Sequence, residues 1–113
     1  SEMCKETADN IIQWAQGCDI LVHEVFSAQG VKRRSPVWQK YHTSVHTSSV
    51  QLGELASQIK PRTLVLNHQL FFRVPDAEGQ VISELDRERE MIREIQQCYQ
   101  GEVISARDGD VVY

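Results

Sequence analysis

Four residues of this chain are candidates for acid–base or metal chemistry because of their types and their positions. His42 and His46 lie four residues apart in "YHTSVHTSSVQLGELA", just before a segment with the pattern of a helix start. Glu24 and His68 each lie near the end of an apolar run. An imidazole can exchange a proton near neutral pH or bind a metal ion through a neutral nitrogen. A carboxylate beside it can hold the ring in one orientation and stabilise its protonated form.

Each of these residues also has a structural interpretation. An ionised Glu24 in an apolar strand would be costly unless paired, whereas a position at an edge in water would carry no such cost. His68 fits a hydrogen-bonded core histidine as well as a metal ligand. A helix N-terminus beside His46 would disfavour its charged form, which suits a ligand or a general base, and the alternative is a plain capping-region residue. The four-residue spacing of His42 and His46 does not by itself distinguish a catalytic role from a structural one.

Three helices are predicted from apolar residues that recur at helical spacing. The first covers residues 5–16 and stops at Gly17. The second begins at Ser48, which together with Gln51 has the spacing of a capping box. The third covers residues 81–99. The expected buried faces are Ala8, Ile11, Ile12 and Ala15 in the first helix, Leu52, Leu55, Ala56 and Ile59 in the second, and Val81, Leu85, Ile92, Ile95 and Tyr99 in the third.

Strands are predicted over residues 18–26, 62–68 and 102–106, followed by a turn at Asp108-Gly109 and a last strand over 110–113. The first of these runs is apolar on both faces, which is typical of a strand covered on both sides. The alternation of helices and strands predicts an α/β layered sheet with right-handed crossovers. Functional groups of such sheets gather beyond the carboxyl ends of the strands.

Residues 27–45 show no clear hydrophobic period and are predicted to form a long loop. The only basic cluster, Lys32-Arg33-Arg34, falls in this segment. We interpret it as a solvated loop rather than as a phosphate contact.

The bulk composition limits the class of protein. A chain of 113 residues with 41% apolar and 25% charged residues forms one globular domain at most. The formal net charge of -4 argues against a strongly basic nucleic-acid surface. Three cysteines without CxxC spacing suggest neither a disulfide framework nor a cysteine zinc site, and reduced thiols fit a cytoplasmic location. Neither a membrane span nor a signal peptide is predicted.

The order of four motifs along the chain is more specific than any single motif. They are "CDILVHEVF", "HTS" at a helix start, "PRTLVLNHQLFF" and the terminal "GEVISARDGDVVY". In this order they resemble the carboxyl-terminal half of the metallo-β-lactamase superfamily. The nearest branch is the ribonuclease Z-like group, with its tRNA 3′-processing endonucleases and arylsulfatase-like hydrolases. The resemblance runs from about Thr7 to Tyr113.

The resemblance implies a role for several residues. His23-Glu24 matches the family's HEA motif, in which the glutamate orients a catalytic histidine. His46, in His46-Thr47-Ser48, matches the histidine of the HST motif, which donates a proton to the leaving group or stabilises the developing oxyanion. His68 matches the last metal-ligand histidine, at the end of an LVLTH-like strand. His42 matches no invariant position, so we interpret it as a loop residue that at most lines the site.

The chain departs from the family because it lacks the HxHxDH metal motif. The aspartate that bridges the two metals would be expected shortly before Thr7, where only six residues stand. The family's cofactor is a pair of zinc or other divalent ions, and each zinc needs three or four ligands. We therefore interpret residues 1–113 as a single partial domain. It would be half of an αβ/βα sandwich, with helices on a mixed sheet and an incomplete metal site.

Two functions follow from this interpretation. One is the carboxyl-terminal part of a metal-dependent hydrolase of phosphodiesters such as RNA 3′ ends, or of a small ester, lactone or sulfate, inactive without the HxHxDH half. The other is a non-catalytic self-association or interaction module with a degenerate metal site. In both, half of a sandwich would expose an apolar sheet face, so a homo-oligomer such as a dimer, or the missing amino-terminal half, is the expected partner.

Overall fold

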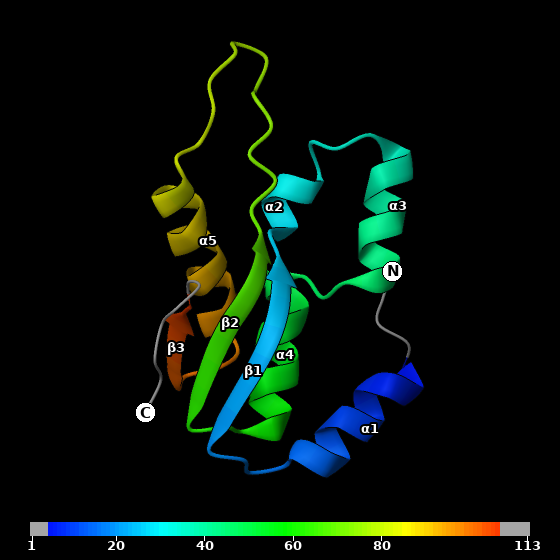
Figure 1. Cartoon of the computed structure of the whole chain (residues 1–113), viewed down its shortest axis with the longest axis vertical. Coiled ribbons are helices and arrows are strands. Elements are labelled where there is room, and N and C mark those ends of the chain that lie inside the picture. Colours follow the sequence, from blue (N-terminus) through cyan, green and yellow to red (C-terminus); the bar gives the residue numbers. More distant parts are fainter. Residues whose placement is uncertain (1–4, 107–113) are drawn as a thin grey trace.

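The computed structural model describes residues 5–106 of the chain, and the side chains of residues 10–106. It confirms the predicted α/β class (Figure 1). The predicted turn at Asp108-Gly109 and the last predicted strand lie outside the described residues. The elements follow in the order α1 (Lys5–Ala15), β1 (Ile20–Phe26), α2 (Ala28–Val31), α3 (Pro36–Val45), α4 (Ser49–Ile59), β2 (Thr63–Leu70), α5 (Glu84–Gln96) and β3 (Glu102–Ser105).

The described sheet has the strand order β1-β2-β3, and both neighbouring pairs are parallel. Val22, Val65 and Ile104 share one register across the three strands. The described strands thus form a parallel sheet, and the second strand of the predicted terminal hairpin lies outside the described residues. Because parallel strands end at the same edge, the residues after β1 and β2 are brought close together.

Helix α4 forms the centre of the helical layer behind β1 and β2 (Figure 1). Its predicted apolar stripe is confirmed, because Leu52, Leu55, Ala56 and Ile59 are all buried. The predicted capping box is also present: Ser48 accepts from the N–H of Gln51, whose side chain accepts from the N–H of Ser48. This box sets the first residue of α4 and hence the position of the segment before it.

Helix α5 differs from its predicted extent of residues 81–99. It begins at Glu84, because the Ser83 hydroxyl accepts from the N–H of Asp86 and caps the helix. Its buried row has a spacing of four residues and continues past the helix end: Arg87, Met91, Ile95 and Tyr99. Val81 lies before the helix and Leu85 lies off this row, so their predicted burial is wrong: they are 46% and 50% exposed.

The face of the sheet away from α4 is open on β1. Val22 is 54% exposed and Ile20 is 37% exposed, whereas Val25 on the same strand is fully buried. The prediction that β1 is covered on both sides is therefore wrong for the described residues, whose helices pack on one face. The apolar alternation of β1 instead indicates a surface suited to a further layer.

Residues 27–45 form two helices rather than the predicted long loop. Ser27 caps α2 by accepting from the N–H of Gly30, and Ser35 precedes α3, in which Pro36 occupies the first turn. Proline is favoured at that position, because its missing N–H would be unpaired there anyway. The helical hydrophobic period of α3 is hard to detect in the sequence, because the buried position of this helix is occupied by a polar residue, His42. Among the described residues, no helix has the length and apolar character needed to cross a membrane.

Candidate active site

Glu24 and His46 meet at the carboxyl end of β1. The Oε2 atom of Glu24 lies 3.5 Å from Nδ1 of His46, and its Oε1 atom accepts a hydrogen bond of 3.0 Å from the N–H of Thr47. The N–H of Phe26 in turn donates to the carbonyl of Thr47 at 2.9 Å. Residues 46–48 therefore run along the free edge of β1 and are held there by both backbone and carboxylate.

The Glu24–His46 contact is an ion-pair contact that is longer than a hydrogen bond. Within the described residues, Oε2 of Glu24 is buried and has no hydrogen-bond partner. A buried acceptor without a donor is unfavourable, so the carboxylate favours a donor on the facing imidazole. Contacts of this kind often shorten only when substrate is bound.

His68 lies beside this pair because of an irregularity in β2. Glu24 pairs with Asn67 and Val25 with Gln69, so His68 has no partner on β1. Its φ of 43° is in the left-handed region, which is rare for residues other than glycine. Such a bulge redirects a side chain, often at a functional site. The ring centroids of His68 and His46 are 6.2 Å apart.

His68 lies at the surface of the described part of the molecule. Within the described residues His68 is exposed and lies outside the hydrophobic core behind the sheet. It lines an open hollow on the open face of the sheet together with Val22, His23, Glu24 and Asn67. A larger polar hollow lies between residues 74–82 and α5 and includes none of the predicted site residues.

The described residues do not fit a complete metal site. No group of three or more histidine, cysteine, aspartate or glutamate side chains within them is placed to hold a metal ion. His68 offers one accessible imidazole, whereas zinc needs three or four protein ligands. The remaining ligands of any metal here would have to come from residues that the structure does not describe.

The position of His46 between two helices differs from the prediction. It is the C-cap of α3, with its N–H bonded to the carbonyl of His42 at 2.9 Å, and it also precedes the N-cap of α4. The negative end of one helix dipole and the positive end of the other therefore both lie near this imidazole. The prediction for His46 considered only the N-terminus of the helix that follows it, so the argument from that dipole alone does not hold.

His42 is a buried residue of α3, and its interpretation as a loop residue is wrong. It is 9% exposed and stacks on His46 with ring centroids 5.8 Å apart, while Phe72 lies 4.6 Å away. Its Nδ1 atom is buried and has no hydrogen-bond partner among the described residues. The four-residue spacing of His42 and His46 was the sequence signal of this stack, but it becomes informative only once a helix is predicted there.

Acidification is expected to destabilise the protein through His42. Burial, and then the charges of Arg34 and His46, lower the pKa of His42 below its ordinary value of 6.5. The unfolded chain therefore takes up this proton at a higher pH than the folded protein does. The stability that neutral His42 provides is complete above pH 6.5 and is lost as the pH falls toward the folded pKa. Thermal unfolding at neutral and mildly acidic pH should show a smaller decrease in Tm for His42→Phe than for the wild type, and equal decreases would contradict this assignment.

Comparison with known proteins shows what this chain resembles in sequence and in fold. A stretch of 60 residues, 53% of this chain, is 35% identical to ribonuclease Z from Limosilactobacillus fermentum and covers 17% of that protein. The structure aligns with the metallo-β-lactamase fold protein YhfI from Bacillus subtilis with a TM-score of 0.60 and 20% identity. That alignment covers 90% of this chain and 34% of YhfI, so the chain spans about a third of that protein's length. No family model matches the chain.

Proposed function

Because this chain has the fold of part of a metallo-β-lactamase domain and is related to ribonuclease Z-like proteins, we propose that it is the carboxyl-terminal part of a metal-dependent hydrolase. The observation that carries the proposal is the Glu24–His46 pair, which lies at one rim of the sheet beside His68. The substrate class proposed is a phosphodiester such as an RNA 3′ end, or a small ester, lactone or sulfate.

In this proposal His46 is the proton donor to the leaving group or supports the developing oxyanion. Glu24 fixes the orientation of the imidazole and stabilises its protonated form. The bond from Thr47 to the same carboxylate keeps both groups at the free edge of β1. His68 would supply one ligand of a zinc or other divalent metal site, which other residues would have to complete.

The partner proposed is a layer that covers Val22 and Ile20 on the open face of the sheet. An amino-terminal half that carries HxHxDH would both cover this face and complete the metal site, so that residues 1–113 form a partial domain. We place the protein in the cytoplasm, because three cysteines without CxxC spacing fit reduced thiols in that compartment.

A second function, a non-catalytic module that associates through its open face, is favoured by the incomplete ligand set of the described residues. The two functions predict different results when this chain is mixed with an amino-terminal half that carries HxHxDH. Gel filtration, zinc analysis and hydrolysis of a chromogenic phosphodiester are measured for this chain alone and after mixing with a half that carries HxHxDH.

The hydrolase proposal predicts that the mixture elutes as one complex, binds two metal ions and hydrolyses the ester, while either half alone is inactive. A metal-loaded complex that hydrolyses neither phosphodiesters nor small esters would contradict it. A stable dimer of this chain that excludes the other half would support the module instead.

A further inference from the structure

We propose that Arg34, His42 and Trp38 form a binding subsite for the phosphate group of an aromatic phosphate ester, next to the Glu24–His46 pair. The biological meaning of this subsite rests on the proposed hydrolase function, whereas its test measures binding alone. The proposal follows from three features of α3 and of the segment just before it.

The first feature is a positioned cation without an anion. The guanidinium carbon of Arg34 lies 5.3 Å from the ring centroid of Trp38 and 5.4 Å from that of Phe72. Cation–π contacts with both rings hold the group in place. Among the side chains of residues 10–106, no carboxylate forms an ion pair with this guanidinium.

Arg34 therefore differs from its neighbours in the basic cluster. Lys32 and Arg33 are exposed, in agreement with the prediction of a solvated segment, whereas Arg34 is partly buried and stacked. A guanidinium presents five N–H donors in a planar fork that matches two phosphate oxygens. Fixing this fork in advance lowers the ordering cost of anion binding.

The second feature is the orphaned nitrogen of His42. Its Nδ1 atom is buried and has no partner, and its ring packs on Phe72, the residue that also lies under Arg34. The positive charge of Arg34 contributes to the lowered pKa of His42, so the two groups interact electrostatically. An anion held by Arg34 would offset this repulsion.

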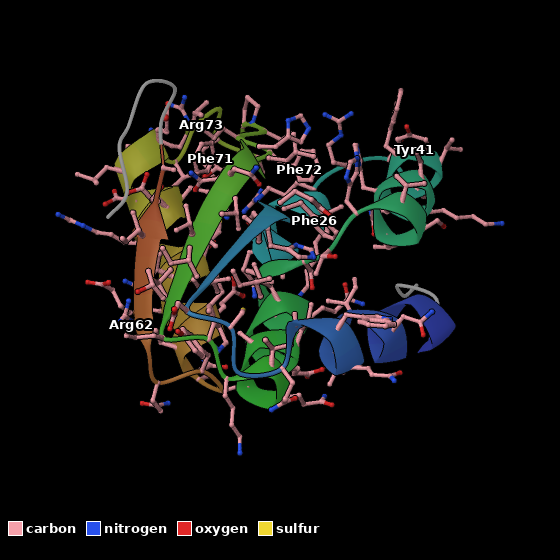
Figure 2. All side chains as sticks on the ribbon, turned by 60° about the horizontal axis from the view of Figure 1, so that its bottom comes forward. Phe26, Tyr41, Arg62, Phe71, Phe72 and Arg73 are labelled. Atoms are coloured by element: carbon pink, nitrogen blue, oxygen red, sulfur yellow. The ribbon has the colours of Figure 1, made fainter. Side chains whose placement is uncertain are left out.

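Phe72 connects these two groups through an unusual backbone. Its φ of 48° is in the left-handed region, which is unfavourable for an aromatic residue. Figure 2 shows Phe72 beside Phe26 near the ends of β2 and β1, and the ring of Phe72 also contacts His42 of α3. The strained segment thus places one ring beneath both Arg34 and His42.

The third feature is an aromatic surface beside the cation. Trp38 and Tyr41 are 49% and 52% exposed and pack edge to face with their ring centroids 5.9 Å apart. Exposed aromatic rings of this kind stack on bases and other flat groups. Because the rings of His42 and His46 are 5.8 Å apart, an ester bound here would lie next to the proposed proton donor.

The test uses the fluorescence of Trp38 in a Trp14→Phe background, since the chain has two tryptophans and Trp14 is 84% exposed. The protein is titrated with inorganic phosphate, phenyl phosphate and phenol at constant ionic strength. We expect saturable binding of both phosphates, with phenyl phosphate tighter, and no saturation with phenol.

Substitutions then test the assignment of the residues. Arg34→Gln should weaken phosphate binding about tenfold or more, because a charge-assisted bidentate contact is lost. Arg33→Gln removes the same charge at the exposed neighbouring position and should leave binding within about twofold, as expected for a screened surface charge. His42→Phe keeps a ring in the stack and should also weaken binding.

Circular dichroism and thermal unfolding establish that each variant is folded. If Arg34→Gln does not fold, Arg34→Lys and His42→Phe carry the test, and both should weaken binding. Equal losses for Arg34→Gln and Arg33→Gln, or the absence of saturable binding in the Trp14→Phe protein, would overturn the subsite. Binding that is lost with Arg34 in a protein without hydrolase activity would support the subsite while refuting the proposed function.

Discussion

Replacing His46 by alanine is expected to lower kcat for ester hydrolysis by the assembled enzyme by about 10²–10⁴-fold, the usual contribution of a positioned general acid or base. The variant leaves the buried Oε2 of Glu24, 3.5 Å from His46 Nδ1 in the wild type, without the facing imidazole. The metal content should not change, because His46 is not proposed as a ligand. Steady-state kinetics and zinc analysis of the same preparations measure both quantities.

Two glutamate variants serve as comparisons for this result. Glu24→Gln should also lower kcat, with a smaller effect, because the imidazole remains but loses the carboxylate that orients it. Glu54→Gln makes the same change at an exposed position of α4 and should leave kcat unchanged. An assembled enzyme that binds two metals and turns over normally with His46→Ala would refute the role assigned to His46.

Replacing Ile95 by alanine is expected to lower the free energy of unfolding by about 2–5 kcal/mol. Ile95 is fully buried in the core behind the sheet, and its backbone carbonyl would lie 2.7 Å from a Cβ atom placed on Gly53. Helices α4 and α5 are thus in close contact at this point, and the cavity left by the variant cannot easily collapse. Urea unfolding of the wild type and the variant measures the difference.

Leu85→Ala is the matched control, because Leu85 belongs to the same helix and was predicted to share its buried face. With half of Leu85 exposed, its replacement should cost about 0.5 kcal/mol or less. Similar losses for the two variants would contradict the difference in burial between Ile95 and Leu85.

Much of the fold could be predicted because its signals are local. The capping box at Ser48 and the apolar stripe from Leu52 to Ile59 lie within one turn or a few turns of helix and determine α4 almost completely. Helix α5 was harder, because its buried row includes Arg87, whose charge hides the period. Helix α3 was missed for a related reason, since its exposed side carries Trp38 and Tyr41 while a histidine is buried.

The site shows the same division between local and distant causes. Glu24 and His68 could be placed at one edge because parallel strands end together, and His46 because it precedes the cap of α4. The bulge that turns His68 depends on the register between β1 and β2, and this register could not be predicted from local sequence patterns. The burial of His42 and the stacking of Arg34 depend on Phe72, which is about 30 or more residues away along the chain.

The convergence of His46, Glu24 and His68 is best tested by nuclear Overhauser effects between the histidine rings in solution. The ring centroids of His46 and His68 are 6.2 Å apart, and those of His42 and His46, neighbours on α3, are 5.8 Å apart and serve as the internal reference. We predict cross-peaks from the ring protons of His46 to His42, to His68 and to the side chain of Glu24. A spectrum in which His46 contacts His42 but neither His68 nor Glu24 would contradict the proposed active site.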